Sequence, residues 1–162
     1  MQYRARVTDV RPALTVTPQP SMAHVTRFAL AGVLDAGAPL EAFGTIPRGR
    51  LELDLSGVRR VTSFGVRDWI EACRRIPAGV TVVWERVSLP MVAQLGMVAN
   101  FAGSAHVASF FAPYYCPKCD ADVPVLLTPE AAPDGAPARS CGTCGTALRF
   151  EELESDFFAF LR

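Results

Sequence analysis

The residues best suited to chemistry are four of the five cysteines, which stand in two short pairs. The pairs are Cys116-Pro-Lys-Cys119 and Cys141-Gly-Thr-Cys144. Each pair can place two thiolates on one tight turn, and the intervening residues 120–140 are enough for a hairpin that brings the turns face to face. Four thiolates in a tetrahedron are the ligands Zn²⁺ prefers, and this spacing is typical of a structural zinc ribbon.

The residue after each pair is consistent with this interpretation. Gly145 follows the second pair, where a zinc-binding turn often needs a positive φ, and Asp120 holds the same place after the first pair. Four thiolates also complete the coordination sphere and leave no position for water. A structural metal is therefore expected, and a catalytic one is not.

Other uses of these cysteines differ in what they require. Two disulfides would need an oxidising compartment, but the chain begins MQYRARVTDV without an apolar signal segment, so we expect a cytoplasmic protein. A redox-active pair would follow a strand, open a helix and need no second pair. Iron in a rubredoxin-like site would use the same four ligands and stays an alternative to zinc.

The composition narrows the range of functions. Half of the 162 residues are hydrophobic, so a sizeable core is available, but the apolar runs fall short of the roughly 20 residues that a bilayer requires. Lys plus Arg equals Asp plus Glu at 16 each, whereas nucleic-acid binding usually needs a basic excess. We therefore expect neither membrane insertion nor nucleic-acid binding.

Strands and helices alternate in the chain before the cysteines. Strands are expected at 3–10, 25–33, 50–55, 80–87 and 107–111, and helices at 38–43, 65–76 and from Ser88 to about 102. Pro12, Pro18 and Pro20 should interrupt regular structure. The alternation implies an α/β fold: a mixed β-sheet with helices packed on it in residues 1–112.

The remaining residues, 113–162, are expected to form a small zinc-ribbon module with a C-terminal helix. Strands at 123–127 and 147–150 would flank a mobile Pro/Ala-rich excursion. The aromatic stretch 110–115 should dock this module, with Tyr114 or Tyr115 at the junction. The tail 151–161 would cover the ribbon or the sheet, or alternatively bind a partner.

Single reactive residues are scarce. Cys73 shares a helical face with apolar residues and is expected to be a small buried hydrophobe. His24 and His106 lack a partner that would suggest catalysis. We do not expect an enzyme.

One segment resembles a known family. The run Leu53-Asp-Leu-Ser-Gly-Val-Arg-Arg-Val-Thr-Ser-Phe-Gly-Val66 is similar to the signature of STAS domains, the fold of anti-sigma factor antagonists and of the cytosolic part of sulfate transporters. Ala31-Gly-Val-Leu-Asp35 resembles the family's Gly-x-Leu-Asp. The likeness extends over about residues 3–112. It implies a regulatory partner, such as a serine kinase acting as anti-sigma factor, or a larger signalling assembly.

The main departure from the family lies at the phosphorylation site. In anti-sigma factor antagonists a kinase phosphorylates the second Ser of Asp-Ser-Ser-Gly at a helix N-terminus, and here the quartet reads Thr62-Ser63-Phe64-Gly65. Phe64 stands at the acceptor position and cannot be phosphorylated by that chemistry. The resemblance thus favours bacterial signalling by docking, with phosphorylation control lost.

The predicted partner face comprises Ser63 and Phe64, with Arg59 and Arg60 as a solvated or anion-accepting face. Three alternatives remain. Phe64 could be a partly buried helix-start residue, Ser63 or Ser56 could accept a phosphate in a working anti-sigma factor antagonist, and the ribbon could be a zinc/thiol redox sensor. A homo-oligomer is also possible.

Overall fold

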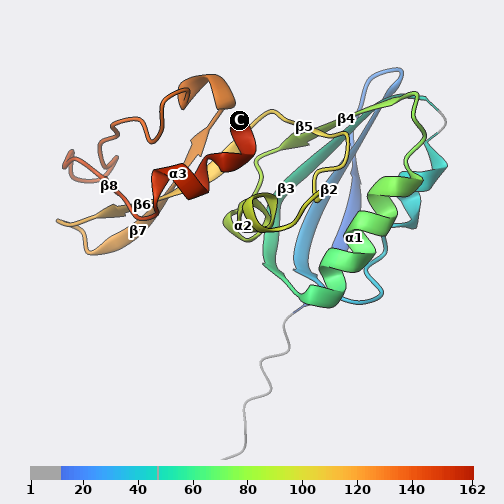
Figure 1. The fold of residues 1–162 in the computed structure, drawn as a ribbon, viewed down its shortest axis with the longest axis horizontal. Helices are drawn as coiled ribbons and strands as arrows, with labels where there is room; N and C mark the ends of the chain where they lie inside the picture. Colours follow the sequence, from blue (N-terminus) through green and yellow to red (C-terminus); the bar gives the residue numbers. More distant parts are fainter. Residues whose placement is uncertain (1–11, 47) are drawn as a thin grey trace, which may run out of the picture.

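A computed structural model describes residues 12–46 and 48–162. They form two sheets (Figure 1), whose buried apolar side chains belong to one continuous hydrophobic core. The strand expected at 3–10 lies outside the described residues. The larger sheet carries the helices of the first part of the chain, and the smaller one carries the cysteine pairs.

The five-stranded sheet has its strands in chain order. They are β1 (Thr15–Gln19), β2 (Val25–Leu34), β3 (Gly49–Val61), β4 (Val80–Glu85) and β5 (His106–Val107). β1 pairs antiparallel with β2, and the other neighbours pair in parallel. The expected mixed sheet of an α/β fold is confirmed.

β1 is an element that the sequence did not suggest. Pro18 lies within it, paired with Phe28 of β2. Proline is tolerated because β1 is an edge strand, where its missing N–H faces away from the ladder. The proline-rich opening therefore extends the sheet instead of interrupting it.

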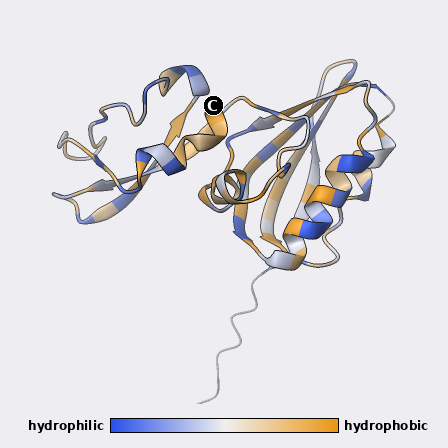
Figure 2. Ribbon diagram, viewed as in Figure 1, coloured by the Kyte–Doolittle hydropathy of each residue, from blue (hydrophilic) through white to orange (hydrophobic). Residues whose placement is uncertain are grey.

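The helical elements between the strands are η1 (Glu41–Thr45), α1 (Ser63–Arg75) and α2 (Leu89–Met97). η1 is a 3-10 helix that begins later than the helix expected at 38–43, and α2 ends before the expected residue 102. Connections between parallel strands are right-handed. Because β2 to β5 follow one another in the sheet in chain order, every connection between them lies on the same face of the sheet. Figure 1 shows α1 lying across that face, and in Figure 2 it alternates between apolar and polar residues.

The core on this face is aromatic. Trp69 of α1 lies between Phe43 of η1 and Trp84 of β4, with ring centroids 5.8 and 5.3 Å away. Its indole N–H donates to the Phe101 carbonyl at 3.1 Å, so the segment after α2 is also tied to α1. Both tryptophans of the chain are fully buried here.

The opposite face of the sheet carries charged side chains on β3. Along β3 the leucines at 51, 53 and 55 are buried in the core, whereas Glu52 and Asp54 point the other way. Glu52 is nevertheless only 6% exposed, because the guanidinium groups of Arg27 and Arg50 cover its carboxylate and donate to it. Desolvation raises the pKa of Glu52, but these two hydrogen bonds outweigh it and hold the pKa below 4.5.

The second sheet is antiparallel with the order β7-β6-β8: β6 (Phe110–Cys116), β7 (Ala121–Leu127) and β8 (Arg149–Phe150). A short 3-10 helix, η2 (Pro129–Ala131), follows β7, and the tail forms two short turns, α3 (Glu154–Phe157) and η3 (Ala159–Leu161). The strand expected at 107–111 is divided between β5 and the start of β6. The expected domain boundary at 112/113 therefore falls inside β6.

Phe110 and α2 join the two parts. Phe110 is fully buried, and its ring lies 6.3, 6.2 and 5.2 Å from those of Phe157, Phe158 and Phe160. α2 packs against β3 on one side and β6 on the other. Tyr114 and Tyr115, which were expected at the junction, make their hydrogen bonds within the C-terminal module. The Tyr114 hydroxyl donates to the Pro137 carbonyl at 2.7 Å, and the Tyr115 hydroxyl donates to the Asp120 carboxylate.

In the described part of the chain, every helix is too short or too polar to cross a bilayer.

Candidate metal centre and helix-start site

The four paired cysteines converge at the tip of the smaller sheet. Their sulfur atoms all lie within 4.8 Å of one another, with Cys116 Sγ 3.5 Å from Cys144 Sγ and Cys119 Sγ 3.9 Å from Cys141 Sγ. A tetrahedral metal with bonds of about 2.3 Å to sulfur separates its ligands by about 3.8 Å. The cluster therefore has the dimensions of a four-thiolate metal site.

The sulfur separations are inconsistent with disulfides, whose sulfur atoms are about 2.05 Å apart. All four cysteines are free thiols, and the close contacts join one pair to the other. Cys116 and Cys141 are buried, and Cys119 is exposed.

Each cysteine pair sits on a turn that directs backbone N–H groups inward. The Cys119 N–H points at Cys116 Sγ, 3.4 Å away. Asp120 and Gly145 follow the pairs with φ of 51° and 72°, the left-handed backbone expected at both places. The Tyr115 hydroxyl donates to the Asp120 carboxylate and so holds that residue in the left-handed conformation.

Hydrogen bonds also set the protonation of the thiols. The Thr146 hydroxyl and backbone N–H lower the pKa of Cys144 to about 6, and the backbone N–H groups of Cys144 and Thr143 lower that of Cys141. Hydrogen bonds with Cys144 and Cys116 raise the pKa of Cys119 to about 12. A metal ion must displace this last proton when it binds.

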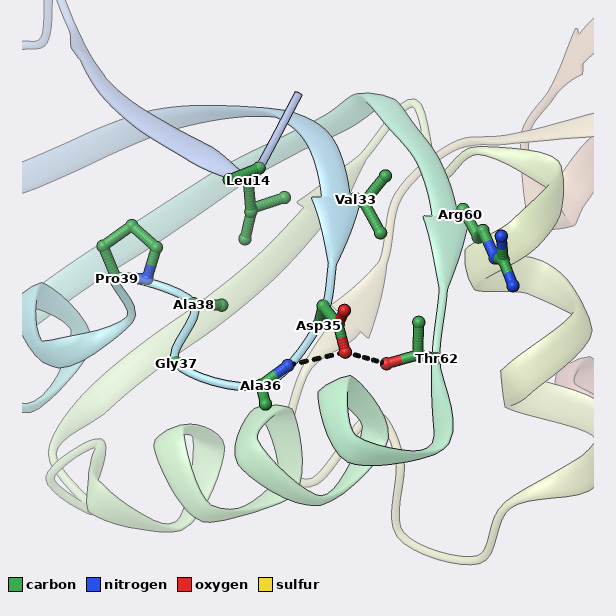
Figure 3. A pocket seen from close by; sticks show the side chains of 10 residues that line it. Leu14, Val33, Asp35, Ala36, Gly37, Ala38, Pro39, Arg60 and Thr62 are labelled. Carbon is green, nitrogen blue, oxygen red and sulfur yellow. Dashed lines mark hydrogen bonds between the residues drawn. The ribbon is translucent and has the colours of Figure 1, made fainter. Parts of the chain in front are cut away.

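A second constellation lies at the start of α1. Thr62 is the N-cap residue, and its hydroxyl accepts a hydrogen bond from the Gly65 N–H at 3.1 Å. The same hydroxyl donates to the Asp35 carboxylate at 2.6 Å, and Asp35 also accepts from the Ala36 N–H at 2.8 Å (Figure 3). These hydrogen bonds hold the pKa of Asp35 below its usual value, and the charge of Arg60 lowers it further.

Close backbone packing fixes the helix start against the end of β2. A Cβ atom on Gly65 would lie 2.1 Å from the Leu34 carbonyl oxygen, far inside van der Waals contact. The Thr62 N–H donates to that same carbonyl at 3.0 Å. The glycine of the Thr-Ser-Phe-Gly quartet is thus required by a backbone contact.

The structure places the predicted partner residues as follows. Ser63 and Phe64 begin α1, both exposed, and the Phe64 side chain is 60% exposed. Arg59 and Arg60 are exposed at the end of β3, where successive side chains point to opposite faces. Ser56 lies farther back on β3, half-buried, with its hydroxyl accepting from Arg86 at 3.1 Å.

Arg60 lines a cleft of about 690 Å³ beside the helix start. Its walls include Leu14, Val33 and Pro39, and Asp35 and Thr62 lie at its base (Figure 3). The sequence identified the quartet but not the Asp35–Thr62 bond. Threonine immediately before a helix is a typical N-cap and was the available signal.

No protein-family model, curated protein or solved structure matches this chain. The fold and the site define an α/β protein with a four-cysteine cluster that could hold a metal ion.

Proposed function

We propose that this chain is a cytoplasmic, non-catalytic interaction protein of the anti-sigma factor antagonist type, which docks onto a regulatory protein through the start of α1. The observation that carries the proposal is the exposure of Phe64, at 60%, in the first turn of that helix. By its resemblance to STAS domains, this is the place where the family carries a phosphorylated serine.

The surroundings of Phe64 suit a docking site. The N-cap network of Thr62 and the close packing of Gly65 fix the backbone of the first turn, so little backbone freedom is lost when a partner binds there. Arg67, one helical turn along, is exposed, and Arg60 lies beside the N-cap. The partner should therefore offer an apolar pocket bordered by acidic side chains.

We further propose that the four cysteines hold a structural Zn²⁺. Support comes from the tetrahedral dimensions of the cluster and from the all-thiolate ligand set, which leaves no open position. The three-stranded sheet is small, and two of its strands are linked by a long excursion without strand structure. A bound metal would supply much of the free energy that folds such a unit.

Affinity capture from cells of the source organism tests the docking proposal. The baits are the unmodified protein, Phe64→Asp and the control Met22→Asp, which alters another exposed apolar residue at 82% exposure. Aspartate is favourable in the first turn of a helix, so Phe64→Asp should fold. A partner captured by the unmodified and control baits but lost with Phe64→Asp supports the proposal. Equal capture by all three baits contradicts it.

A phosphorylation switch is a second candidate, because Ser63 is exposed at the first position of α1. A phosphate there would meet unpaired N–H groups and the positive end of the helix dipole. Intact-mass spectrometry after incubation with the organism's serine kinases tests this role. Addition of one phosphate that is lost in Ser63→Ala supports the switch, and an unchanged mass contradicts it.

A further inference from the structure

A second surface feature lies on the other side of α2, away from the start of α1. A groove of about 580 Å³ separates α2 from the C-terminal module. Leu89, Ala93 and Met97 form its α2 wall, and Phe157 and Ala159 belong to the opposite wall. The groove is therefore built from segments that are distant in sequence, and it shares no lining residue with the cleft beside Asp35.

Its apolar lining is open to solvent. The Met97 side chain is 70% exposed at the end of α2, and Ala93 and Ala159 of the lining are exposed as well. The walls come together at Gly96, where an added Cβ atom would lie 3.6 Å from the Asp156 carbonyl oxygen. One long apolar side chain inserted beside Met97 would meet apolar atoms from both walls.

The charged residues that line the groove are acidic. Glu152 and Asp156 line it, and among its described lining residues there is neither lysine nor arginine. The neighbouring Glu151 adds to the negative charge. Glu154 instead turns toward the excursion, where its carboxylate accepts from the Ala136 N–H at 3.2 Å. An apolar groove with an acidic border selects a cationic ligand with an apolar anchor.

We propose that this groove binds a peptide segment of a partner protein, in which one large apolar side chain is flanked by lysine or arginine. The apolar side chain enters between Met97 and Phe157, and the flanking cations lie against Glu152 and Asp156. This surface is separate from the Phe64 docking face and would add a second contact to it.

Selection from a phage-displayed library of random peptides against the whole, zinc-loaded protein tests this proposal. We expect the enriched peptides to combine an aromatic or long aliphatic residue with lysine or arginine. Binding of the most enriched peptide, synthesised with a fluorescent label, is then measured by fluorescence anisotropy. Ala93→Trp places a large side chain in the groove from an exposed position and should weaken binding at least tenfold.

Charge variants keep the test valid if Ala93→Trp fails to fold. The double variant Glu152→Lys with Asp156→Lys should bind the same peptide several-fold more weakly than the unmodified protein. Added salt should reduce this difference in affinity. Glu71→Lys, which alters an exposed acid on α1, is the matched control and should bind normally. Phe64→Asp should also bind normally, which separates this groove from the docking face.

The proposal is overturned if no peptide is enriched, or if the enriched peptides lack lysine and arginine. It is also overturned if Ala93→Trp and the charge variants bind the peptide as tightly as the unmodified protein. Sedimentation of the unmodified protein as a dimer that Ala93→Trp dissociates would also overturn it, because a second copy would then occupy the groove.

Discussion

The Thr62 hydroxyl donates a 2.6 Å hydrogen bond to the Asp35 carboxylate while it caps the first turn of α1. One side chain thus joins the turn after β2 to the start of the helix that presents Phe64. The position of the proposed docking residue depends on this bond more than on its own contacts, because Phe64 is largely exposed.

Removal of the Thr62 hydroxyl should therefore destabilise the part of the protein built on the five-stranded sheet. We expect Thr62→Ala to lower the free energy of unfolding by about 1 kcal/mol, the usual cost of losing an N-cap. Thr62→Ser keeps a hydroxyl and should retain most of that stability. Urea unfolding followed by tryptophan fluorescence measures both. Equal stability of the alanine and serine variants would show that the cap contributes nothing.

Gly65 should not tolerate a side chain. Gly65→Ala places a methyl group 2.1 Å from the Leu34 carbonyl oxygen, so we expect a loss of about 1–3 kcal/mol in unfolding free energy as the helix is displaced. Gly79→Ala is the control, because an added Cβ there meets no atom within 4 Å. Equal urea midpoints for the two variants would contradict the close backbone contact between α1 and the end of β2.

Metal content should depend on the paired cysteines alone. We expect one zinc per chain in the purified protein and a large loss in Cys119→Ser, with no change in Cys73→Ala, because Cys73 lies on α1 where burial raises the pKa of its thiol to about 12. Inductively coupled plasma mass spectrometry gives the metal and its stoichiometry. Iron in place of zinc would contradict the zinc assignment, and normal metal content in Cys119→Ser would contradict the ligand set.

Chelation should unfold the C-terminal module and leave the core beside the five-stranded sheet largely intact. The two tryptophans of the chain pack against each other beside the five-stranded sheet, so their fluorescence reports on that part of the protein. We expect a chelator to reduce the circular dichroism signal of residues 110–162 without shifting the tryptophan emission maximum. A red shift on chelation would mean that the packing of Phe110 and α2 makes the two parts one cooperative unit.

Glu52 should make stability depend on pH. Because its pKa is lowered in the folded protein, its contribution is present above the ordinary value of 4.5 and is lost as the pH falls through the folded-state pKa. We expect Glu52→Gln to cost about 1 kcal/mol at pH 7 and progressively less in acid. Urea unfolding of both proteins across this range tests the expectation, and since both lose metal in acid, only their difference is used. A constant difference would contradict it.

The sequence predicted local features better than spatial ones. The cysteine turns and the left-handed Asp120 and Gly145 follow from a few adjacent residues, so they were accessible without a structure. β1 was missed because the tolerance of Pro18 depends on its edge position, which only the assembled sheet defines. The Asp35–Thr62 bond and the α2 groove likewise join residues far apart in the chain.

The junction was misplaced for a related reason. The aromatic run of β6 alternates between two sides, so Phe110 and Tyr114 are both buried, and the sequence does not tell which one meets the tail. Phe110 contacts Phe157 of α3 and Phe160 of η3, whereas the Tyr114 ring meets Phe150. Which of these two aromatic residues meets the tail depends on where α3 and η3 pack, and the sequence does not show this.

The most direct test of the docking account is site-specific photo-crosslinking in cells of the source organism. Benzoyl-phenylalanine is placed at position 64 and, as the control, at position 22, where the native side chain is also exposed. We expect one partner protein to crosslink strongly at position 64 and not at position 22. Absence of a crosslink at position 64, or the same products from both positions, would contradict a docking face at the start of α1.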